Sequence, residues 1–133
     1  DSKLLKKHLV IPTKKKLTPN QLSTGLFAWK VVKHTKSNAI VVAKNNKIIS
    51  ISGGQTSRVD ATKIAFEKTK IPKGCVVASD AFFPFKDSIE KMAQYKIAAI
   101  IQPGGSIRDR EVVESCNKNK IAMAFTGFRV FKH

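Results

Sequence analysis

Three blocks in the second half of the chain combine residue types that could bind an anionic aromatic ligand. Ser79–Phe85 places three phenylalanines around a proline, Gln102–Asp109 contains a glycine pair, and Phe128–His133 ends the sequence. Such an aromatic cluster suits neither a strand nor a helix, so we expect a rigid corner at the mouth of a site, with a core corner as the alternative. Arg129 could be an exposed charge, but its aromatic neighbours would hold its guanidinium group toward a phosphate or carboxylate.

Two glycine pairs and two aspartates extend this candidate site. Gly53–Gly54 and Gly104–Gly105 each precede a predicted helix, where free backbone N–H groups can bind an anion. Each pair alone is explained slightly better by a tight turn, but two of them beside an aromatic corner favour a ligand site. Asp80 could cap the next turn and Asp87 could be a helix N-cap, so capping and ligand contact both stay open for these carboxylates.

The histidines and cysteines form no metal or catalytic pattern. His8, His34 and His133 have no mutual spacing typical of metal binding, so we interpret them as isolated side chains. Cys75 and Cys116 lie in apolar contexts without a CxxC arrangement, which predicts reduced thiols and neither a zinc site nor a disulfide framework. No Ser-His-Asp or Cys-His arrangement can be argued, so no motif indicates a self-contained catalyst.

The charge of the chain is strongly positive, at +16 from 25 Lys and Arg against 9 Asp and Glu. Such a field attracts polyanions, and nucleic acid is the obvious partner at the level of composition. Only four of the basic residues are arginines, however, and base and bidentate phosphate recognition favours arginine. We therefore interpret the lysines as a solvated surface whose field helps to attract small anionic substrates, with nucleic acid disfavoured.

The length of 133 residues suits one domain with an ordinary core. The sequence opens on Asp1 instead of Met and continues with an irregular Lys-rich stretch, so we expect a fragment of a longer protein. Residues 1–17 are predicted to form an N-terminal strand and a basic linker. No apolar run reaches about 18 residues and no signal-peptide pattern is present, which predicts neither membrane insertion nor secretion.

The first half of the chain predicts a strand, a helix and a hairpin. The strand is expected at 8–13, and the helix begins at the Thr18 N-cap, with Pro19 and Gln21 completing a capping box, and ends near Lys36. Its buried face should comprise Leu22, Leu26, Phe27 and Val31, with Trp29 in the adjoining core. Residues 38–43 and 47–52 read as a hairpin around Asn45–Asn46.

The second half alternates helices and strands. A helix capped by Ser57 should bury Ala61, Ile64 and Ala65, with Phe66 as a further candidate. Strands are expected at 75–78, 97–102 and 121–126, and helices at 87–96 and 109–119, burying Ile89, Met92, Ala93, Val112, Val113 and Cys116. This βαβ alternation predicts a parallel sheet covered by helices, with the loops at Gly53, Phe82 and Gly104 opening at one ligand-binding edge.

Three further motifs stand upstream of the blocks: LFAWKVVKH at 26–34, KSNAI at 36–40 and GQTSRVD at 54–60. With these motifs and the three blocks, in order and at near-matching spacing, the chain from about Leu9 to His133 resembles the C-terminal part of the bifunctional purine-biosynthesis enzymes. These enzymes join aminoimidazolecarboxamide ribonucleotide (AICAR) formyltransferase to inosinate cyclohydrolase. The resemblance implies a three-layer α/β/α fold with a mixed sheet, cytidine-deaminase-like, as the second of two such units in the formyltransferase.

The resemblance also implies a reaction and its site residues. A formyl group would pass from 10-formyltetrahydrofolate, as co-substrate, to the 5-amino group of AICAR, with no metal required. Toward AICAR, it places Asn38 near the ring and amine, Phe82 on the imidazole, and Arg129 on the phosphate. Toward the folate, it assigns Arg58, Val59, Pro84, Phe85, Asp87 and Ser106: Pro84 and Phe85 line the pocket with Ser106 nearby, Asp87 accepts hydrogen bonds from the pterin, and the backbone at 58–59 meets the pterin edge.

The chain departs from the family by omission. The catalytic Lys-His pair lies in the first unit, upstream of this sequence, and Lys33–His34 corresponds to a noncatalytic dipeptide, so no catalytic residue is assigned here. The cyclohydrolase domain is missing too. We expect a cytoplasmic homodimer in which this chain works with the rest of the transferase domain, and an inactive isolated chain. Two alternatives remain: a stand-alone noncatalytic ligand-binding module of the same fold, and a basic nucleic-acid-binding domain.

Overall fold

A five-stranded mixed sheet forms the middle of the protein. The computed structural model describes residues 9–35, 39–53, 58–67, 69–80 and 86–127, with the backbone alone at 58–60, 86 and 87. The strands are β1 (Ile40–Lys44), β2 (Lys47–Ser52), β3 (Val76–Ser79), β4 (Ala99–Gln102) and β5 (Ala122–Phe125). Their order is β2-β1-β3-β4-β5, with β1 antiparallel to both neighbours and β3, β4 and β5 parallel.

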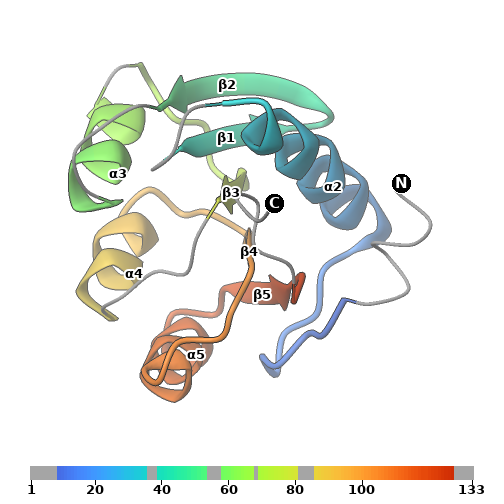
Figure 1. The fold of residues 1–133 in the computed structure, drawn as a ribbon, viewed down its shortest axis with the longest axis vertical. Coiled ribbons are helices and arrows are strands. Elements are labelled where there is room, and N and C mark those ends of the chain that lie inside the picture. The colour runs from blue at the N-terminus through green and yellow to red at the C-terminus, as the bar shows by residue number, and fades with distance from the viewer. Residues whose placement is uncertain (1–8, 36–38, 54–57, 68, 81–85, 128–133) are drawn as a thin grey trace.

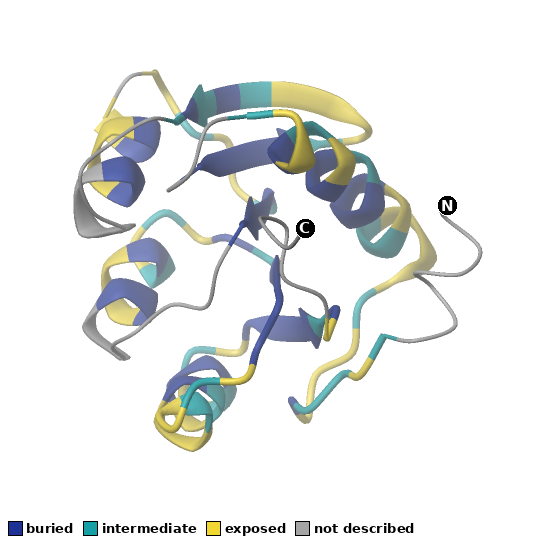
Figure 2. Ribbon diagram, in the orientation of Figure 1, coloured by how far each residue is buried: buried dark blue, intermediate teal, exposed yellow. Residues whose placement is uncertain are grey.

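Helices cover both faces of this sheet, as Figure 1 shows. They are α2 (Pro19–Lys33), α3 (Arg58–Glu67), α4 (Lys86–Ala93) and α5 (Asp109–Lys118). Alternate residues of a strand point to opposite faces, so Val41 and Ala43 pack with α2 while Ile40 and Val42 pack with α3, α4 and α5. The fold is therefore α/β with three layers, as predicted, and its buried residues line the two interfaces (Figure 2).

Helix α2 begins where the sequence predicts but buries a different face. Thr18 Oγ1 accepts from the Gln21 N–H at 3.1 Å and Gln21 Oε1 accepts from the Thr18 N–H at 2.9 Å, which confirms the capping box. The helix ends at Lys33, three residues before the predicted end. Trp29 is only 2% exposed, which confirms its place in the core.

Small residues explain the altered face of α2. Leu26 is buried, but Leu22, Phe27 and Val31 are only half-buried, and Thr24, Gly25 and Ala28 take the inner positions with Trp29 and Val32. A Cβ on Gly25 would come within 3.5 Å of Val76 Cγ1, so the backbone of α2 lies close to the sheet. A prediction that uses only large apolar residues therefore misplaces the buried face of a helix that packs through small residues.

The predicted hairpin is confirmed. Asn45 and Asn46 have φ angles of 51° and 61°, the left-handed pair that a two-residue turn of type I′ requires. Ile40 pairs with Ser52 and Lys44 with Lys47, with an irregularity in register after Val42.

Helix α3 corrects one predicted core residue. Ala61, Ala65 and Phe66 are buried as expected, whereas Ile64 is 38% exposed. The buried stripe of α3 is shared by Ala61 and Ala65 with Thr62 and Phe66, and at 100° per residue Ile64 falls outside that stripe. In α4 and α5, likewise, Ala93 and Val113 are half-buried while the other predicted core residues are buried.

The N-terminal segment seals the outer edge of β5, although the predicted strand at 8–13 is reduced to one bridge. Val10 and Phe125 exchange two backbone hydrogen bonds, at 3.0 and 2.7 Å. The ladder stops there because Pro12 has no N–H to donate. The Thr13 hydroxyl instead accepts a hydrogen bond from the buried Met123 N–H at 2.9 Å. Among the helices of the described residues, none combines the length and the apolar composition that a membrane span needs.

Replacing Thr13 with valine tests the hydrogen bond between the Met123 N–H and the Thr13 hydroxyl. The Thr13→Val variant keeps the shape but leaves the Met123 N–H without an acceptor, which should cost about 1–3 kcal/mol of unfolding free energy. Urea denaturation of Thr13→Val beside Thr69→Val, at an exposed threonine, measures the difference. Equal stability of the two variants would show that the bond contributes nothing.

Gly104 is the second position that we expect to be sensitive. Its φ is +78° and an added Cβ would lie 2.8 Å from Phe125 Cγ, whereas Gly105, at φ +94°, has nothing within 4 Å of its Cβ position. Gly104→Ala combines backbone strain with a clash and should cost about 2–3 kcal/mol, against about 1 for Gly105→Ala. Thermal and urea unfolding of the two variants provides the comparison, and an equal loss would refute the role of the Phe125 ring.

Candidate functional site

The strand directions bring five chain segments to one edge of the sheet. Because β1 is antiparallel to β2 and β3, the carboxyl ends of β2, β3, β4 and β5 lie beside the start of β1. Ser52 and Ser79 both pair with Ile40, and Gln102 pairs with Phe125. We call this end of the sheet the carboxyl edge, and it is where ligands bind in most sheets of this kind.

Five of the eleven buried polar side chains among the described residues lie at the carboxyl edge. They are Ser52, Ser79, Asp80, Gln102 and Thr126, and each is at most 5% exposed. Burying polar groups is costly without partners, so their accumulation at one sheet end indicates a specific role. Gln102 Nε2 lies 3.2 Å from Met123 Sδ, a weak acceptor, while the buried Ser52 Oγ has no hydrogen-bond partner within the part of the chain that the structure describes.

Sequence reasoning included three of these residues within its blocks but missed Ser52 and Thr126. The available signal was positional, since each polar residue stands at or just after the end of an apolar strand. Ser50, on the same face of β2 as Ser52, shows the contrast because its hydroxyl donates to the Ala65 carbonyl at 2.6 Å. Ser50 thus has a structural role in holding α3, which Ser52 lacks.

The glycine loop at 103–106 is held by hydrogen bonds to Asp109, the first residue of α5. The Asp109 carboxylate accepts from the Gly105 N–H at 2.8 Å and from the Ser106 N–H at 3.2 Å. The Ser106 hydroxyl accepts from the Arg108 N–H at 3.1 Å. These two loop N–H groups are therefore already paired, which favours the tight-turn interpretation over an anion-binding loop, and half-buried Ser106 is the predicted site residue whose side chain is described.

The structure describes no side chain for the remaining predicted site residues. Asn38, Phe82, Pro84, Phe85 and Arg129 lie outside the described residues, as do Gly54 and the expected Ser57 cap. Arg58, Val59 and Asp87 are described by backbone alone, in the first turns of α3 and α4. The described residues next to these segments are Ala39, Gly53, Asp80 and Gly127, and each follows or precedes a strand at the carboxyl edge.

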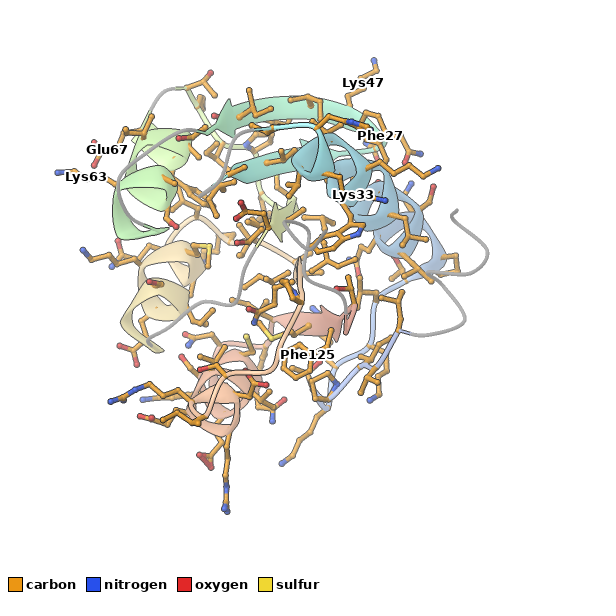
Figure 3. All side chains as sticks on the ribbon, in the orientation of Figure 1. Phe27, Lys33, Lys47, Lys63, Glu67 and Phe125 are labelled. Atoms are coloured by element: carbon orange, nitrogen blue, oxygen red, sulfur yellow. The ribbon has the colours of Figure 1, made fainter. Side chains whose placement is uncertain are left out.

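A separate cleft of about 290 Å³ lies between α3 and α4. Thr62, Phe66, Ser88, Met92 and Tyr95 contribute to its lining, and the rings of Phe66 and Tyr95 are 4.8 Å apart. Lys63 and Glu67, also lining it, project from the outer side of α3 in Figure 3. Ser106, the predicted site residue whose side chain is described, does not line this cleft.

The other groups that could do chemistry have structural surroundings. Burial raises the pKa of the Cys116 thiol to about 12, and burial, partly offset by nearby Lys44, raises the pKa of Cys75. Both thiols are therefore protonated and unsuited to nucleophilic attack at neutral pH. Lys33 and His34 are exposed at the C-terminal end of α2, and the described residues contain no group of three or more His, Cys, Asp or Glu that could hold a metal ion.

Comparison with known proteins gives consistent matches. "Bifunctional purine biosynthesis protein PurH" of Aquifex aeolicus (strain VF5) is 55% identical over 134 residues, covering 98% of this chain. The proteins of the same name from Acetivibrio thermocellus and Petrotoga mobilis are 56% and 60% identical, over 94% and 81% of the chain. The chain spans about a quarter of the length of these relatives, at 26%, 24% and 21%.

The family model described as "AICARFT/IMPCHase bienzyme" matches residues 1–68, just over half of the chain. That match and the relatives agree with the resemblance carried by the motifs at 26–34, 36–40 and 54–60. The chain therefore belongs to the AICARFT/IMPCHase bienzyme family.

Proposed function

We propose that this chain is the second, cytidine-deaminase-like unit of an AICAR formyltransferase domain, forming one domain over residues 1–133. The observation that carries the proposal is an identity of 55% to a bifunctional purine biosynthesis protein across 98% of the chain. The mixed sheet, with one antiparallel strand inserted among four others, supports the proposed fold assignment. In this proposal the unit acts in purine biosynthesis within the complete enzyme, as a cytoplasmic homodimer.

The reaction transfers a formyl group between two amines. The 5-amino nitrogen of AICAR attacks the formyl carbon of 10-formyltetrahydrofolate and forms a new C–N bond. The bond from that carbon to N10 of the folate then breaks, and the proton lost by the attacking amine balances the proton gained by N10. The Lys-His pair that assists this proton transfer would come from the other unit of the transferase, and the proposed transfer uses no metal.

This chain would supply groups that bind and orient the two substrates. Arg129 would pair with the phosphate, because a guanidinium fork matches a phosphate dianion. Phe82 would stack on the imidazole, and Asn38 would lie near the ring and the attacking amine. Ala39, Asp80 and Gly127, the described neighbours of these segments, lie next to strands β1, β3 and β5 at the carboxyl edge, which supports a shared AICAR site.

The folate would bind along the first turns of α3 and α4. Pro84 and Phe85 would line its pocket, and the Asp87 carboxylate would accept hydrogen bonds from the pterin amino group. The backbone at 58–59 would meet the pterin edge. Ser106 would lie near the pocket, where its hydroxyl, already accepting from the Arg108 N–H, retains a proton to donate.

Replacing Arg129 tests the phosphate assignment. In the complete enzyme, Arg129→Ala should raise the Michaelis constant for AICAR by about 10- to 100-fold, because a hydrogen bond to a charged group contributes about 1.5–3 kcal/mol. The Michaelis constant for the folate should stay nearly unchanged. Steady-state kinetics with each substrate varied in turn measures both constants.

Two matched variants complete this experiment. Arg110→Ala removes an exposed arginine of α5 and should leave both constants unchanged. Asp87→Asn should give the converse result, with the folate constant raised and the AICAR constant retained. An unchanged AICAR constant in Arg129→Ala would remove the phosphate assignment.

The isolated 133-residue chain should catalyse no formyl transfer. It lacks the upstream unit that carries the catalytic Lys-His pair in the family, so it can offer only part of the proposed site. Incubating it with AICAR and 10-formyltetrahydrofolate, and following tetrahydrofolate release against a no-protein blank, checks this expectation. Turnover that scales with protein concentration would contradict the division of roles between the units.

A further inference from the structure

The sheet edge opposite the candidate site is bordered by exposed lysines. The loops there join β1 to β2, α3 to β3, α4 to β4 and α5 to β5. Six exposed lysines of these loops and helix ends, which we call the lysine edge, are Lys47, Lys70, Lys73, Lys96, Lys118 and Lys120. Lys47 projects outward beside the hairpin in Figure 3.

Backbone and side-chain contacts make these loops neighbours in space. Lys44 Nζ donates to the Lys73 carbonyl at 2.6 Å, which joins the hairpin to the loop before β3. The Gly74 N–H donates to the Lys96 carbonyl at 2.8 Å, and the Ala122 N–H donates to the Ala98 carbonyl at 3.1 Å. Because neighbouring strands lie about 4.8 Å apart, the lysine edge extends for about 20 Å across the five strands.

The loops of this positive surface carry no acidic residue, while the exposed Glu67 is the last residue of α3 at the same end of the sheet. Residues 44–47, 69–75, 94–98 and 117–121 contain neither Asp nor Glu. Asp60, Asp87 and Asp109 stand instead in the first turns of α3, α4 and α5, at the other end of the sheet. Helix dipoles favour this distribution in part, since they attract anions to helix N-termini and cations to C-termini, but Lys47 and Lys73 lie outside any helix.

Two of the lysines occupy backbone positions that do not suit them. Lys96 and Lys120 have φ angles of 58° and 57°, just after α4 and α5. This left-handed position following a helix usually belongs to glycine or asparagine, because other side chains are strained there. At both positions, lysine therefore stands where glycine or asparagine would be less strained.

The residues between the lysines limit the kind of partner. The lysine edge contains no arginine, and the exposed residues among its lysines include Asn45 and Asn46 of the hairpin turn. Tyr95 is half-buried and its ring packs against Phe66 at a centroid distance of 4.8 Å. Ammonium groups bind phosphates as point charges, whereas base recognition relies on arginine, amide pairs and aromatic stacking.

We propose that the lysine edge binds the sugar–phosphate backbone of duplex nucleic acid without reading its bases. Its length of about 20 Å corresponds to about six base pairs at 3.4 Å each, enough for several lysines to meet successive phosphates. The shortage of arginine in the sequence argues against base recognition and is fully compatible with this backbone contact. The proposal does not depend on the proposed enzyme function, because it uses the opposite edge of the sheet.

The test compares two variants of equal net charge. Lys70, Lys73, Lys96 and Lys120 are changed to Gln in one, and Lys30, Lys33, Lys63 and Lys91, exposed on α2, α3 and α4, in the other. Both carry +12, since four charges are removed from +16. Fluorescence anisotropy of a labelled 20-base-pair DNA of mixed sequence, titrated with each 133-residue chain, gives the dissociation constant and its dependence on salt.

The unchanged chain should bind at 0.15 M salt with a dissociation constant of about 1–100 µM, equally well to a second unrelated sequence. The edge variant should bind at least about tenfold more weakly, and its salt slope should fall by about 3–4, near 0.9 for each phosphate that is no longer neutralised. The control variant should stay within about twofold. Equal weakening of both folded variants, no binding below 100 µM, or equal competition by poly-L-glutamate at matched charge would each overturn the proposal.

Discussion

The antiparallel pairing of β1 with β3 is the interaction on which both ends of the molecule depend. It runs from Ile40 opposite Ser79 to Ala43 opposite Val76, and it joins the hairpin to the parallel βαβ part. Because β1 runs against β3, β2 runs with β3, and Ser52 therefore comes into line with Ser79. The same pairing sets Lys44 against the loop at Lys73 on the opposite edge. A slip of one residue would turn the alternating apolar side chains of β1 toward the wrong helices.

The fold separates its charges along the strand direction. Each of α3, α4 and α5 begins at the carboxyl edge and ends at the lysine edge, so the positive ends of their dipoles point toward the candidate site. Aspartates in the first turns offset that field, and lysines after the last turns complement the negative ends. An anionic substrate at the carboxyl edge therefore experiences helix dipoles and the net charge together, with nearby aspartates opposing them.

The sequence predicts elements whose signals are local. The Thr18 capping box, the Asn45–Asn46 turn and the βαβ alternation depend on residues close in the chain, and all three are confirmed. The strand expected at 8–13 fails because its ladder depends on a partner strand and on the missing N–H of Pro12. The prediction for Ile64 is wrong, and that for the buried face of α2 is confirmed only in part, because the tertiary direction of a helix decides which residues face inward.

In the candidate site, too, some features can be predicted from the sequence and others cannot. Right-handed crossovers predict which loops meet at the carboxyl edge, so the topology of the site could be derived before its geometry. The pairing of the Gly105 and Ser106 N–H groups with Asp109 could not be derived from the sequence, because an aspartate in that position is also compatible with a free anion-binding loop. Ser50 and Ser52 look alike in the sequence, two residues apart on one strand, and only the approach of α3 distinguishes them.

The difference between Ser50 and Ser52 concerns the stability of the buried polar side chains at the carboxyl edge. A buried hydroxyl without a partner costs about 1–3 kcal/mol relative to a paired one, and alanine would avoid this cost at the end of β2. Among the described residues, Ser52 Oγ has no partner with which to form a stabilising hydrogen bond, whereas Ser50 bonds to the Ala65 carbonyl. Ser115 Oγ of α5 is also buried without a partner among the described residues, but of these two hydroxyls only Ser52 lies at the end of the sheet where ligands bind, where a substrate can supply the missing partner.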